Sequence, residues 1–321
     1  MKVAVCTSYG SPEVVQLVDS PIPIPKANEV LIKITAASVA SADWRIRSST
    51  LPRGFGLMGR LILGLFRPRQ PVLGTELVGI ITEVGANVRR FGVGDKVVAF
   101  PAVRMKCHAE YRTMPEDGRI LHRPARLSDP EAASLFFGGT TALAFLRDVG
   151  KLSPGEKVLI LGASGCVGTA AVQIARAMGA DVTGVCSAAH SDVVQRLGAS
   201  RVINYERDDF AATGDKWDII LDTVGATTFL NARGSLSPSG RFLMVAGDLP
   251  ALLGTIFSGK RARGGTAPEK VSDMETLVTL AINGKYRPVI DSSFAFEDII
   301  SAHARVETGH KQGNVVVHMA P

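Results

Sequence analysis

A short turn of glycine and other small residues restricts the fold of this chain more than any other feature. Residues 157–161 form an apolar run, residues 169–178 show the apolar periodicity of a helix, and the turn between them contains Gly162-Ala163-Ser164-Gly165-Cys166-Val167-Gly168. Further β-like runs follow at 182–186, 201–204, 218–222 and 241–245, with helical patterns between most of them. Strands that alternate with helices predict βαβ units and therefore an α/β fold with a doubly wound parallel sheet.

The same turn has the composition of a dinucleotide-binding site. Small residues let the backbone approach a pyrophosphate, and the free N–H groups and dipole of the helix that follows favour its negative charge. The pattern is A-x-G-x-x-G, with Ala163 where the first glycine usually stands. The alternative is a tight strand-to-helix connection without a ligand. We expect these residues to bind the cofactor: Ala163, Ser164, Gly165, Cys166, Val167 and Gly168.

The residues after the second strand of this unit indicate which cofactor is bound. A carboxylate about 20 residues beyond the glycines binds the ribose hydroxyl of NAD and repels a 2′-phosphate. Here the run 182–186 leads into Ser187 and His190, and the nearest acid is Asp192. With Ser187, His190 and Tyr205 as donors, the sequence favours NADPH over NADH, although no arginine stands at the strand end. Tyr205 has an alternative role as a packing residue.

Composition and cysteine spacing narrow the class of protein. Apolar residues make up 46% and charged residues 21% of the chain, which is ordinary for a globular protein and excludes extensive disorder. The four cysteines are scattered without a C-x-x-C pattern, so neither a disulfide scaffold nor a structural zinc site is supported. The N-terminus lacks the apolar segment of a signal peptide, and we expect a reduced, cytoplasmic protein.

The pattern of runs along the chain predicts two domains. Short β-rich runs with turn signals fill residues 1 to about 125, and strand and helix patterns alternate beyond them. We expect a β-rich domain from residues 1–125 plus 266–321, with residues 126–265 inserted as the dinucleotide-binding domain. Residues 129–149 are expected to be mostly helical, with an interruption at Gly138-Gly139-Thr140-Thr141.

The net charge of +6 comes from two glycine-rich, apolar segments. The remainder is close to neutral, which argues against a nucleic-acid-binding surface. Three interpretations are open: a lid or substrate wall formed by 53–70 and 249–265, surface loops without a role, or peripheral membrane contact. The last rests on Leu57, Leu61, Leu63, Leu65 and Phe66 between arginines. The cations, with no acid in either segment, are Arg53, Arg60, Arg67 and Arg69 in 51–75, and Lys260, Arg261 and Arg263 in 249–268.

Short motifs spread over nearly the whole chain carry a family resemblance. They include Ala37-Ser38-Val39, Asp43-Trp44-Arg45, Leu73-Gly74-Thr75-Glu76, Ala109-Glu110-Tyr111, the glycine turn and Val202-Ile203-Asn204-Tyr205. In this order they resemble a zinc-independent medium-chain dehydrogenase/reductase of the quinone oxidoreductase-like type. The resemblance implies a GroES-like catalytic domain split by a Rossmann domain, with the active site in the cleft between them. By analogy it also implies a homodimer formed through an edge strand of the Rossmann sheet.

The positions that hold catalytic zinc in related alcohol dehydrogenases carry other residues here. The first falls near residues 40–42, the second is Thr75 and the third falls near Gly138, while the adjacent Cys107 and His108 do not make a three-ligand site. Without a Lewis acid, alcohol oxidation lacks its means of forming an alkoxide near neutral pH. Hydride addition to a quinone, enone or enal needs only donors for the developing oxyanion in a dry cleft. We therefore expect a metal-free, NADPH-dependent oxidoreductase with a small-molecule quinone or enone acceptor.

The resemblance also suggests residues around the nicotinamide and the acceptor. Arg45, a permanent cation, is a candidate to stabilise the oxyanion, with Asp43 beside it. The alternative is a solvent-facing arginine paired with Asp43. Two of the implied cofactor contacts have a structural alternative: Thr141 could cap a helix, and residues 245–247 could simply end a strand. Those implied cofactor residues are Thr141, Val224, Gly225, Val245, Ala246, Gly247 and Asn314.

Other function classes fit the sequence less well. A short-chain reductase needs Tyr-x-x-x-Lys, and none of the four tyrosines has lysine four residues on. A hydrolase nucleophile elbow, Gly-x-Ser-x-Gly, fails because Cys166 occupies the last glycine position. Two alternatives stay open: a non-catalytic NADPH-binding redox sensor or adaptor, and a carbonyl or alcohol oxidoreductase of the same superfamily.

Overall fold

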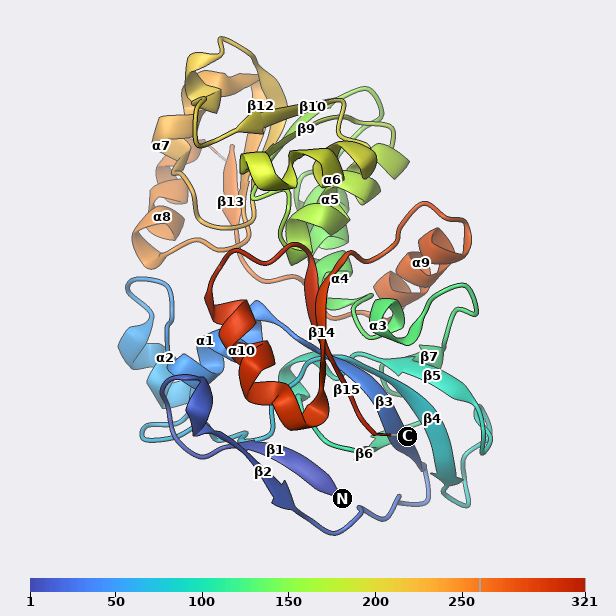
Figure 1. Ribbon diagram of the computed structural model, residues 1–321. Coiled ribbons are helices and arrows are strands. Elements are labelled where there is room, and N and C mark those ends of the chain that lie inside the picture. Colours follow the sequence, from blue (N-terminus) through green and yellow to red (C-terminus); the bar gives the residue numbers. More distant parts are fainter. Residues whose placement is uncertain (260, 321) are drawn as a thin grey trace.

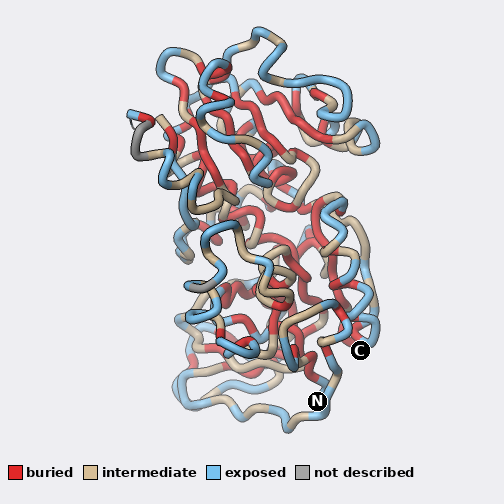
Figure 2. Tube along the Cα trace, turned by 90° about the vertical axis from the view of Figure 1, so that its left-hand side faces the viewer, coloured by how far each residue is buried: buried red, intermediate tan, exposed pale blue. Residues whose placement is uncertain are grey.

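The computed structural model describes residues 1–259 and 261–320, and two large sheets lie one above the other in Figure 1. Lys260, assigned above to a basic segment, and the side chain of Leu57 lie outside the described parts. Buried residues run through both sheets, and most exposed residues lie in the loops around them (Figure 2). Among the described residues, no helix has the length and apolar character needed to cross a membrane.

The upper sheet is the predicted doubly wound sheet. Its strands are parallel, and the central β8, β9 and β11 are largely apolar and buried, because a doubly wound sheet is covered on both faces. The order β10-β9-β8-β11-β12-β13 reverses direction between β8 and β11, and ligands of such sheets bind at the carboxyl ends of the strands near this reversal. The fold class is therefore as predicted. Within the described residues the six strands are β8 (Lys157–Leu161), β9 (Asp181–Cys186), β10 (Arg201–Asn204), β11 (Trp217–Asp222), β12 (Leu236–Met244) and β13 (Ala262–Gly264).

Helices cover this sheet and connect its strands. α5 follows β8 and buries nine of its residues, because its apolar side packs against the sheet. The others are shorter and leave more of their surface exposed. These helices are α5 (Cys166–Ala177), α6 (Ser191–Arg196), α7 (Phe229–Ala232) and α8 (Leu249–Gly254).

The lower sheet joins the two ends of the chain. β15 pairs antiparallel with β3 and parallel with β14, so the last strands of the chain complete the sheet that begins with β3. β6 (Tyr111–Pro115) pairs with β3, β1 (Lys2–Cys6) pairs with β2 (Val15–Asp19), and α1 (Ser41–Ser48) packs on α10 (Ile299–Glu307). The path is β14 (Ile290–Ala295), β15 (Asn314–His318), β3 (Glu29–Val39), β4 (Leu77–Val84), β5 (Lys96–Ala99) and β7 (Ile120–His122).

The region between the sheets corrects one prediction. The expected interruption at residues 138–141 is wrong: these residues lie inside α4 (Phe137–Leu143), which continues into a π-helical turn, Ala144–Val149. A Cβ at Gly138 would lie 2.7 Å from the carbonyl oxygen of Cys166, and one at Gly139 would lie 2.8 Å from Leu277. The glycines thus allow close packing of α4 on α5 and α9 (Val271–Ile282) rather than a turn. The break comes earlier, after α3 (Asp129–Ala132).

The two basic segments meet each other. The first contains α2 (Gly56–Leu63), and α8 belongs to the second; both helices lie on the same side of the molecule (Figure 1). The Leu249 N–H donates to the Arg53 carbonyl at 3.0 Å, and Arg53 Nε lies 3.2 Å from Asp248 Oδ2. A link between segments so far apart in sequence could not be predicted from either one.

Candidate active site

The glycine turn joins β8 to α5 at the carboxyl edge of the upper sheet. Gly162 has a φ of +74°, which side chains rarely adopt, and a Cβ at Gly168 would lie 2.1 Å from the Gly162 carbonyl oxygen. A Cβ at Gly165 would meet no atom nearer than 3.5 Å, so the space beside this residue is open. Gly165 is also the N-cap of α5, where backbone N–H groups are free to bind an anion. The turn therefore fits a pyrophosphate.

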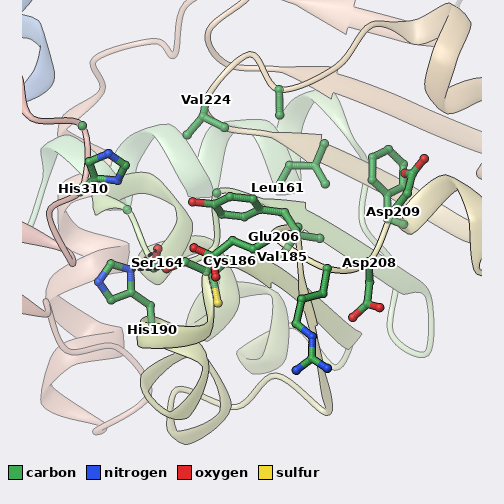
Figure 3. A pocket seen from close by; sticks show the side chains of 18 of the residues that line it. Leu161, Ser164, Val185, Cys186, His190, Glu206, Asp208, Asp209, Val224 and His310 are labelled. Atoms are coloured by element: carbon green, nitrogen blue, oxygen red, sulfur yellow. Dashed lines mark hydrogen bonds between the residues drawn. The ribbon is translucent and has the colours of Figure 1, made fainter.

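A cavity of about 740 Å³ opens in front of this turn (Figure 3). It follows the carboxyl ends of β8, β9 and β10, where doubly wound sheets bind nucleotides. Its size and position suit the adenosine and phosphate portions of a dinucleotide. The predicted residues that line it are Ser164, Gly165, Ser187, His190, Tyr205 and Val224.

Two hydroxyl groups gather around one imidazole at the rim of this cavity. His190 Nδ1 lies 3.2 Å from Ser164 Oγ and 3.4 Å from Ser187 Oγ, which joins the glycine turn to the end of β9. The His190 and Ser164 side chains can be followed in Figure 3. Hydroxyl and imidazole groups in such a cluster can donate to phosphate oxygens. Ser187 and His190 therefore line the cavity at the end of β9, and their role in binding the cofactor stays a prediction.

A carboxylate at the same rim was missed. Glu206 Oε2 accepts the Ala188 N–H at 3.1 Å, and Glu206 lines the same cavity as Ser187. The expectation that no carboxylate lies near the 2′-position considered only the residues after β9. It is wrong for the cavity as a whole, because Glu206 comes from the turn after the neighbouring strand β10.

A buried lysine from the C-terminal segment lies beside the glycine turn. Lys311 is 8% exposed and lines the cavity, and its ammonium donates to the Gly313 carbonyl at 2.5 Å. The Gly313 N–H in turn donates to the Ser164 carbonyl at 2.8 Å, which ties this loop to the turn. Burial lowers the pKa of Lys311, so a bound anion would stabilise its charged form. Sequence analysis missed Lys311 because only the fold brings residue 311 next to residue 164.

A second cavity, of about 400 Å³, lies at the carboxyl ends of β11 and β12 and faces α1. Val224 and Ala226 line both cavities, so the two adjoin at this loop. The predicted residues Arg45, Gly225, Ala246 and Gly247 line the second cavity, together with Leu51 and Asp248 from the two basic segments.

A buried carboxylate holds the loop between the two cavities. Asp222 Oδ1 accepts the N–H groups of Val224, Gly225 and Ala226 at 3.1, 2.8 and 3.1 Å, and Oδ2 accepts that of Thr227 at 3.1 Å. Asp222 is 1% exposed, and these four bonds compensate its desolvation. Asp222 thereby fixes the loop that lines both cavities.

Arg45 is a half-buried cation at the edge of the second cavity. Its pKa is lowered by burial alone, and among the described residues no carboxylate forms an ion pair with it. The neighbouring Arg47, by contrast, points away and bonds Glu307 at 2.8 Å. A desolvated guanidinium without a carboxylate partner is suited to an oxygen that gains negative charge.

Asp43 does not accompany Arg45 into this cavity. It is fully buried, and its oxygens accept the N–H groups of Ala40 at 2.7 Å and Gly74 at 2.8 Å. Burial raises the pKa of Asp43. The geometry gives Asp43 a positioning role, since it caps α1 and holds this helix against the loop before Thr75.

A second buried carboxylate links the lower sheet to α4. Glu76 Oε1 accepts from Ser38 Oγ at 2.9 Å, and Oε2 accepts the N–H groups of Phe136 and Phe137 at 2.8 and 3.1 Å. Burial, with a smaller contribution from Asp43, raises the pKa of Glu76 to about 7, although the hydrogen bonds from Phe136, Ser38 and Phe137 act to lower it. Glu76 was noted in the sequence only as part of a motif, without a role.

The remaining predicted residues do not line either cavity. Thr141 Oγ1 donates to the Phe137 carbonyl at 2.8 Å within α4, and Asn314 Nδ2 donates to the Val289 carbonyl at 3.0 Å. Burial raises the pKa of the Cys166 thiol to about 11. Ala163, Cys166, Val167 and Gly168 shape the turn and the start of α5 behind the cavity wall, and Val245 precedes the lining residues 246 and 247.

The donor set does not fit a catalytic zinc ion. Thr75 stands at one ligand position, and its buried Oγ1 has no hydrogen-bond partner. His108 Nε2 lies 3.0 Å from the Ser38 carbonyl oxygen, and burial raises the pKa of the Cys107 thiol to about 12. In residues 1–259 and 261–320, no group of three or more His, Cys, Asp or Glu side chains is arranged to hold a metal.

Comparison with known proteins identifies the family. The alcohol dehydrogenase GroES-like domain model matches residues 26–144, and the zinc-binding dehydrogenase model matches residues 197–317. The mitochondrial NAD(P)H oxidoreductase RTN4IP1 of Bos taurus is 32% identical over an alignment that covers 98% of this chain and 88% of that protein. The chain belongs to the quinone oxidoreductase-like family of medium-chain dehydrogenases/reductases.

Two further relatives agree with this assignment. The chloroplastic quinone-oxidoreductase QR1 of Triphysaria versicolor is 31% identical, with 94% of this chain and 92% of that protein covered. The solved structure of the quinone oxidoreductase from Coxiella burnetii is 30% identical and superposes with a TM-score of 0.85, covering 100% of this chain and 99% of that one. The predicted family, the GroES-like and parallel α/β architecture and the oxidoreductase class are thus confirmed.

Proposed function

We propose that this oxidoreductase uses NADPH to reduce a quinone or an alkene activated by a carbonyl group, without a metal ion. The observation that carries the proposal is that two neighbouring cavities share one loop. One runs along the glycine turn, the other faces Arg45, which has no ion-pair partner among the described residues, and Val224 and Ala226 line both. Relatives whose names include NAD(P)H or quinone oxidoreductase support the same reaction class.

The residues present fit a nicotinamide dinucleotide. Gly165, the start of α5 and Lys311 would hold the pyrophosphate. The loop fixed by Asp222 and the backbone of Ala246 and Gly247 would contact the nicotinamide end. When bound, the reduced nicotinamide supplies a hydride to the acceptor.

Arg45 accounts for the part of the reaction that the protein itself must assist. As the acceptor carbon gains hydride, the carbonyl oxygen conjugated to it gains negative charge. The guanidinium of Arg45 stabilises this charge more strongly in a partly desolvated cavity than in water. A proton from water then completes the quinol or the saturated carbonyl compound. No step requires a Lewis acid, in accord with Thr75 at a zinc-ligand position.

The preference for NADPH depends on the charge balance at the rim of the first cavity. Ser164, Ser187 and His190 supply donors for the 2′-phosphate, and Arg207 adds a cation to the lining. Glu206 opposes them, since a carboxylate repels a phosphate, and Asp208 and Asp209 add negative charge to the same lining. We expect the E206Q variant to bind NADPH several-fold more tightly than wild type, and NADH no more tightly, because a carboxylate that repels the 2′-phosphate can accept from the ribose hydroxyl of NADH. Tighter binding of NADH than of NADPH by wild type would refute the coenzyme assignment.

Single-turnover oxidation tests the reaction. Protein loaded with one equivalent of NADPH is mixed with a panel of soluble quinones and a panel of enones, and absorbance at the nicotinamide band is followed. Rapid oxidation by members of one panel supports the proposal and names the acceptor class. Tight NADPH binding without oxidation by any acceptor would instead indicate the redox sensor. Stoichiometric zinc in elemental analysis, with activity lost on its removal, would refute the metal-free mechanism.

A further inference from the structure

The segment after α1 exposes large apolar side chains at helical spacing. Met58, Leu61 and Ile62, at positions i, i+3 and i+4 of α2, are 49%, 58% and 64% exposed. Leu65 and Phe66, directly after the helix, are 48% and 85% exposed. We call these five residues the apolar patch. Monomeric soluble proteins rarely gather so many large apolar side chains on one short segment without a partner for them.

The opposite side of α2 is anchored to the body of the protein. A Cβ at Gly59 would lie 1.9 Å from Leu51, so the helix backbone sits directly on this side chain. The guanidinium of Arg60 lies over the Tyr9 ring at 5.4 Å, and Tyr9 Oη donates to the Gly64 carbonyl at 2.7 Å. These contacts fix the helix so that the apolar patch faces outward.

The charge around the apolar patch has one sign. Arg67 and Arg69 are exposed beside Phe66, Arg53 is exposed at the other end of the segment, and residues 51–75 contain no acid. Asp248, which lies 3.2 Å from Arg53, offsets only one of these cations. Apolar side chains flanked by arginines match the chemistry of an anionic lipid interface, where the former enter the acyl boundary and the latter bind headgroups.

The same segment walls the second cavity. Thr50, Leu51 and Pro52 line it on the side of α1, and Leu51 also supports α2 through Gly59. Asp248 and Ala251 line the side contributed by α8. Helix α2 and Leu51 therefore lie between the apolar patch and the cavity that Arg45 faces. Figure 2 views the side of the molecule on which α2 and α8 lie.

We infer that the apolar patch, with Arg67 and Arg69, docks the protein on an anionic membrane surface. We further infer that the acceptor is a lipid-soluble quinone that reaches the second cavity from that surface. The second statement rests on the proposed reductase function, whereas the first stands on the surface alone. Because α2 also supports the wall of the second cavity, docking through α2 would bring this cavity close to the bilayer. A quinone that is insoluble in water could then enter the cavity without passing through the solvent.

Co-sedimentation with vesicles tests the docking surface. We expect wild type to sediment with phosphatidylcholine vesicles that contain 30% phosphatidylglycerol, and to bind pure phosphatidylcholine or high-salt samples much less. The I62S/F66S variant should lose about tenfold or more in partition coefficient, because two large apolar side chains no longer enter the interface. The R67Q/R69Q variant should lose about fivefold for each arginine with the anionic vesicles only.

Matched control variants distinguish docking through the apolar patch from non-specific adsorption of exposed apolar side chains to the vesicles. Ile24 and Val93 are 87% and 67% exposed in other loops, so the I24S/V93S variant should bind vesicles like wild type. Absence of vesicle binding by wild type, or equal binding by wild type and I62S/F66S, would overturn the docking inference. A change from dimer to monomer in I62S/F66S, measured by light scattering, would show that the apolar patch joins two copies instead and would also overturn it.

Activity assays separate this inference from the proposed function. With a water-soluble quinone and no vesicles, I62S/F66S should reduce the acceptor as fast as wild type. With a long-chain quinone embedded in the anionic vesicles, its rate should fall in proportion to its weaker docking. Equal rates for both proteins on the embedded quinone would refute delivery from the membrane. Failure of wild type with every soluble quinone and enone would refute the proposed function and leave the docking result standing.

Discussion

Replacement of the buried Glu76 by glutamine should change how stability depends on pH. Glu76 is 1% exposed, and burial raises its pKa from 4.5 to about 7. Between these values the folded protein holds a proton on Glu76 and the unfolded chain does not. Stability therefore falls as pH rises through this window, and it does not change further above the folded pKa. At about 1.4 kcal/mol per pH unit, the loss is about 3 kcal/mol.

The Glu76→Gln variant removes this titration and keeps an oxygen for the Phe136 N–H. It should be about 3 kcal/mol more stable relative to wild type at pH 7.5 than at pH 4.5. Urea unfolding followed by circular dichroism at half-unit pH intervals gives this difference directly. The pKa of the buried Asp43 is also raised, but Asp43 is present in both proteins, so its contribution largely cancels from the comparison.

Glu116→Gln provides a control of opposite sign. Glu116 is exposed, and the N–H groups of Arg90 and Arg89 lower its pKa. The contribution of Glu116 to the free energy of unfolding is present above its unfolded pKa and is lost as pH falls. Glu116→Gln should therefore be less stable than wild type at neutral pH, and this difference should disappear in acid. If the difference between Glu76→Gln and wild type stayed constant within about 0.5 kcal/mol from pH 4.5 to 7.5, Glu76 would not titrate there and the assigned cause would be wrong.

Three further predictions follow from the site. Gly168→Ala should abolish coenzyme binding in a fluorescence titration, because its Cβ would lie 2.1 Å from the Gly162 carbonyl oxygen, whereas Gly165→Ala, with 3.5 Å of clearance, should fold with an unchanged melting temperature. Arg45→Met should lower kcat for the acceptor about 100-fold with the Kd for NADPH unchanged, and Arg45→Lys should recover part of the loss; a normal kcat in Arg45→Met would exclude the proposed charge stabilisation. His190→Ala should weaken NADPH binding about tenfold at pH 6 and leave NADH binding unaltered, as measured by calorimetry; equal losses for both coenzymes would mean that His190 supports the turn rather than a phosphate.

The elements of the upper sheet were predictable because each has a local signal. β8 and β9 are mostly apolar runs that the sheet buries on both faces, and the turn after β8 needs the conformation of Gly162 and the space beside Gly168. Residues 138–141 were misassigned because a glycine pair has two meanings in a sequence. Glycines can form a turn or admit a neighbouring helix, and only the contacts with Cys166 and Leu277 distinguish the two.

The site was predictable only where its residues follow the strand ends in order. Ser164, Ser187 and His190 were found in this way, because the carboxyl ends of parallel strands share one edge. Lys311 and Glu206 were missed, since each reaches the cavity from another strand or from the far end of the chain. Arg45 and Asp43, which the sequence analysis placed side by side, do not lie together, because residues two apart on a helix do not share a face. Asp43 points into the protein and Arg45 into the cavity.

The separation of these two side chains also explains how one short helix serves both sheets. Asp43 fixes the start of α1 to the Gly74 N–H in the lower half of the molecule, and Arg47 fixes its end to Glu307 on α10. Arg45 lies between these anchors on the side that faces the loop held by Asp222 in the upper half. The position of Arg45 relative to this loop therefore depends on how the lower and upper halves pack against each other. Variants that loosen either anchor should therefore reduce turnover more than they reduce coenzyme binding, since α1 contributes Arg45 to the second cavity, whereas the glycine turn and Lys311 line the first.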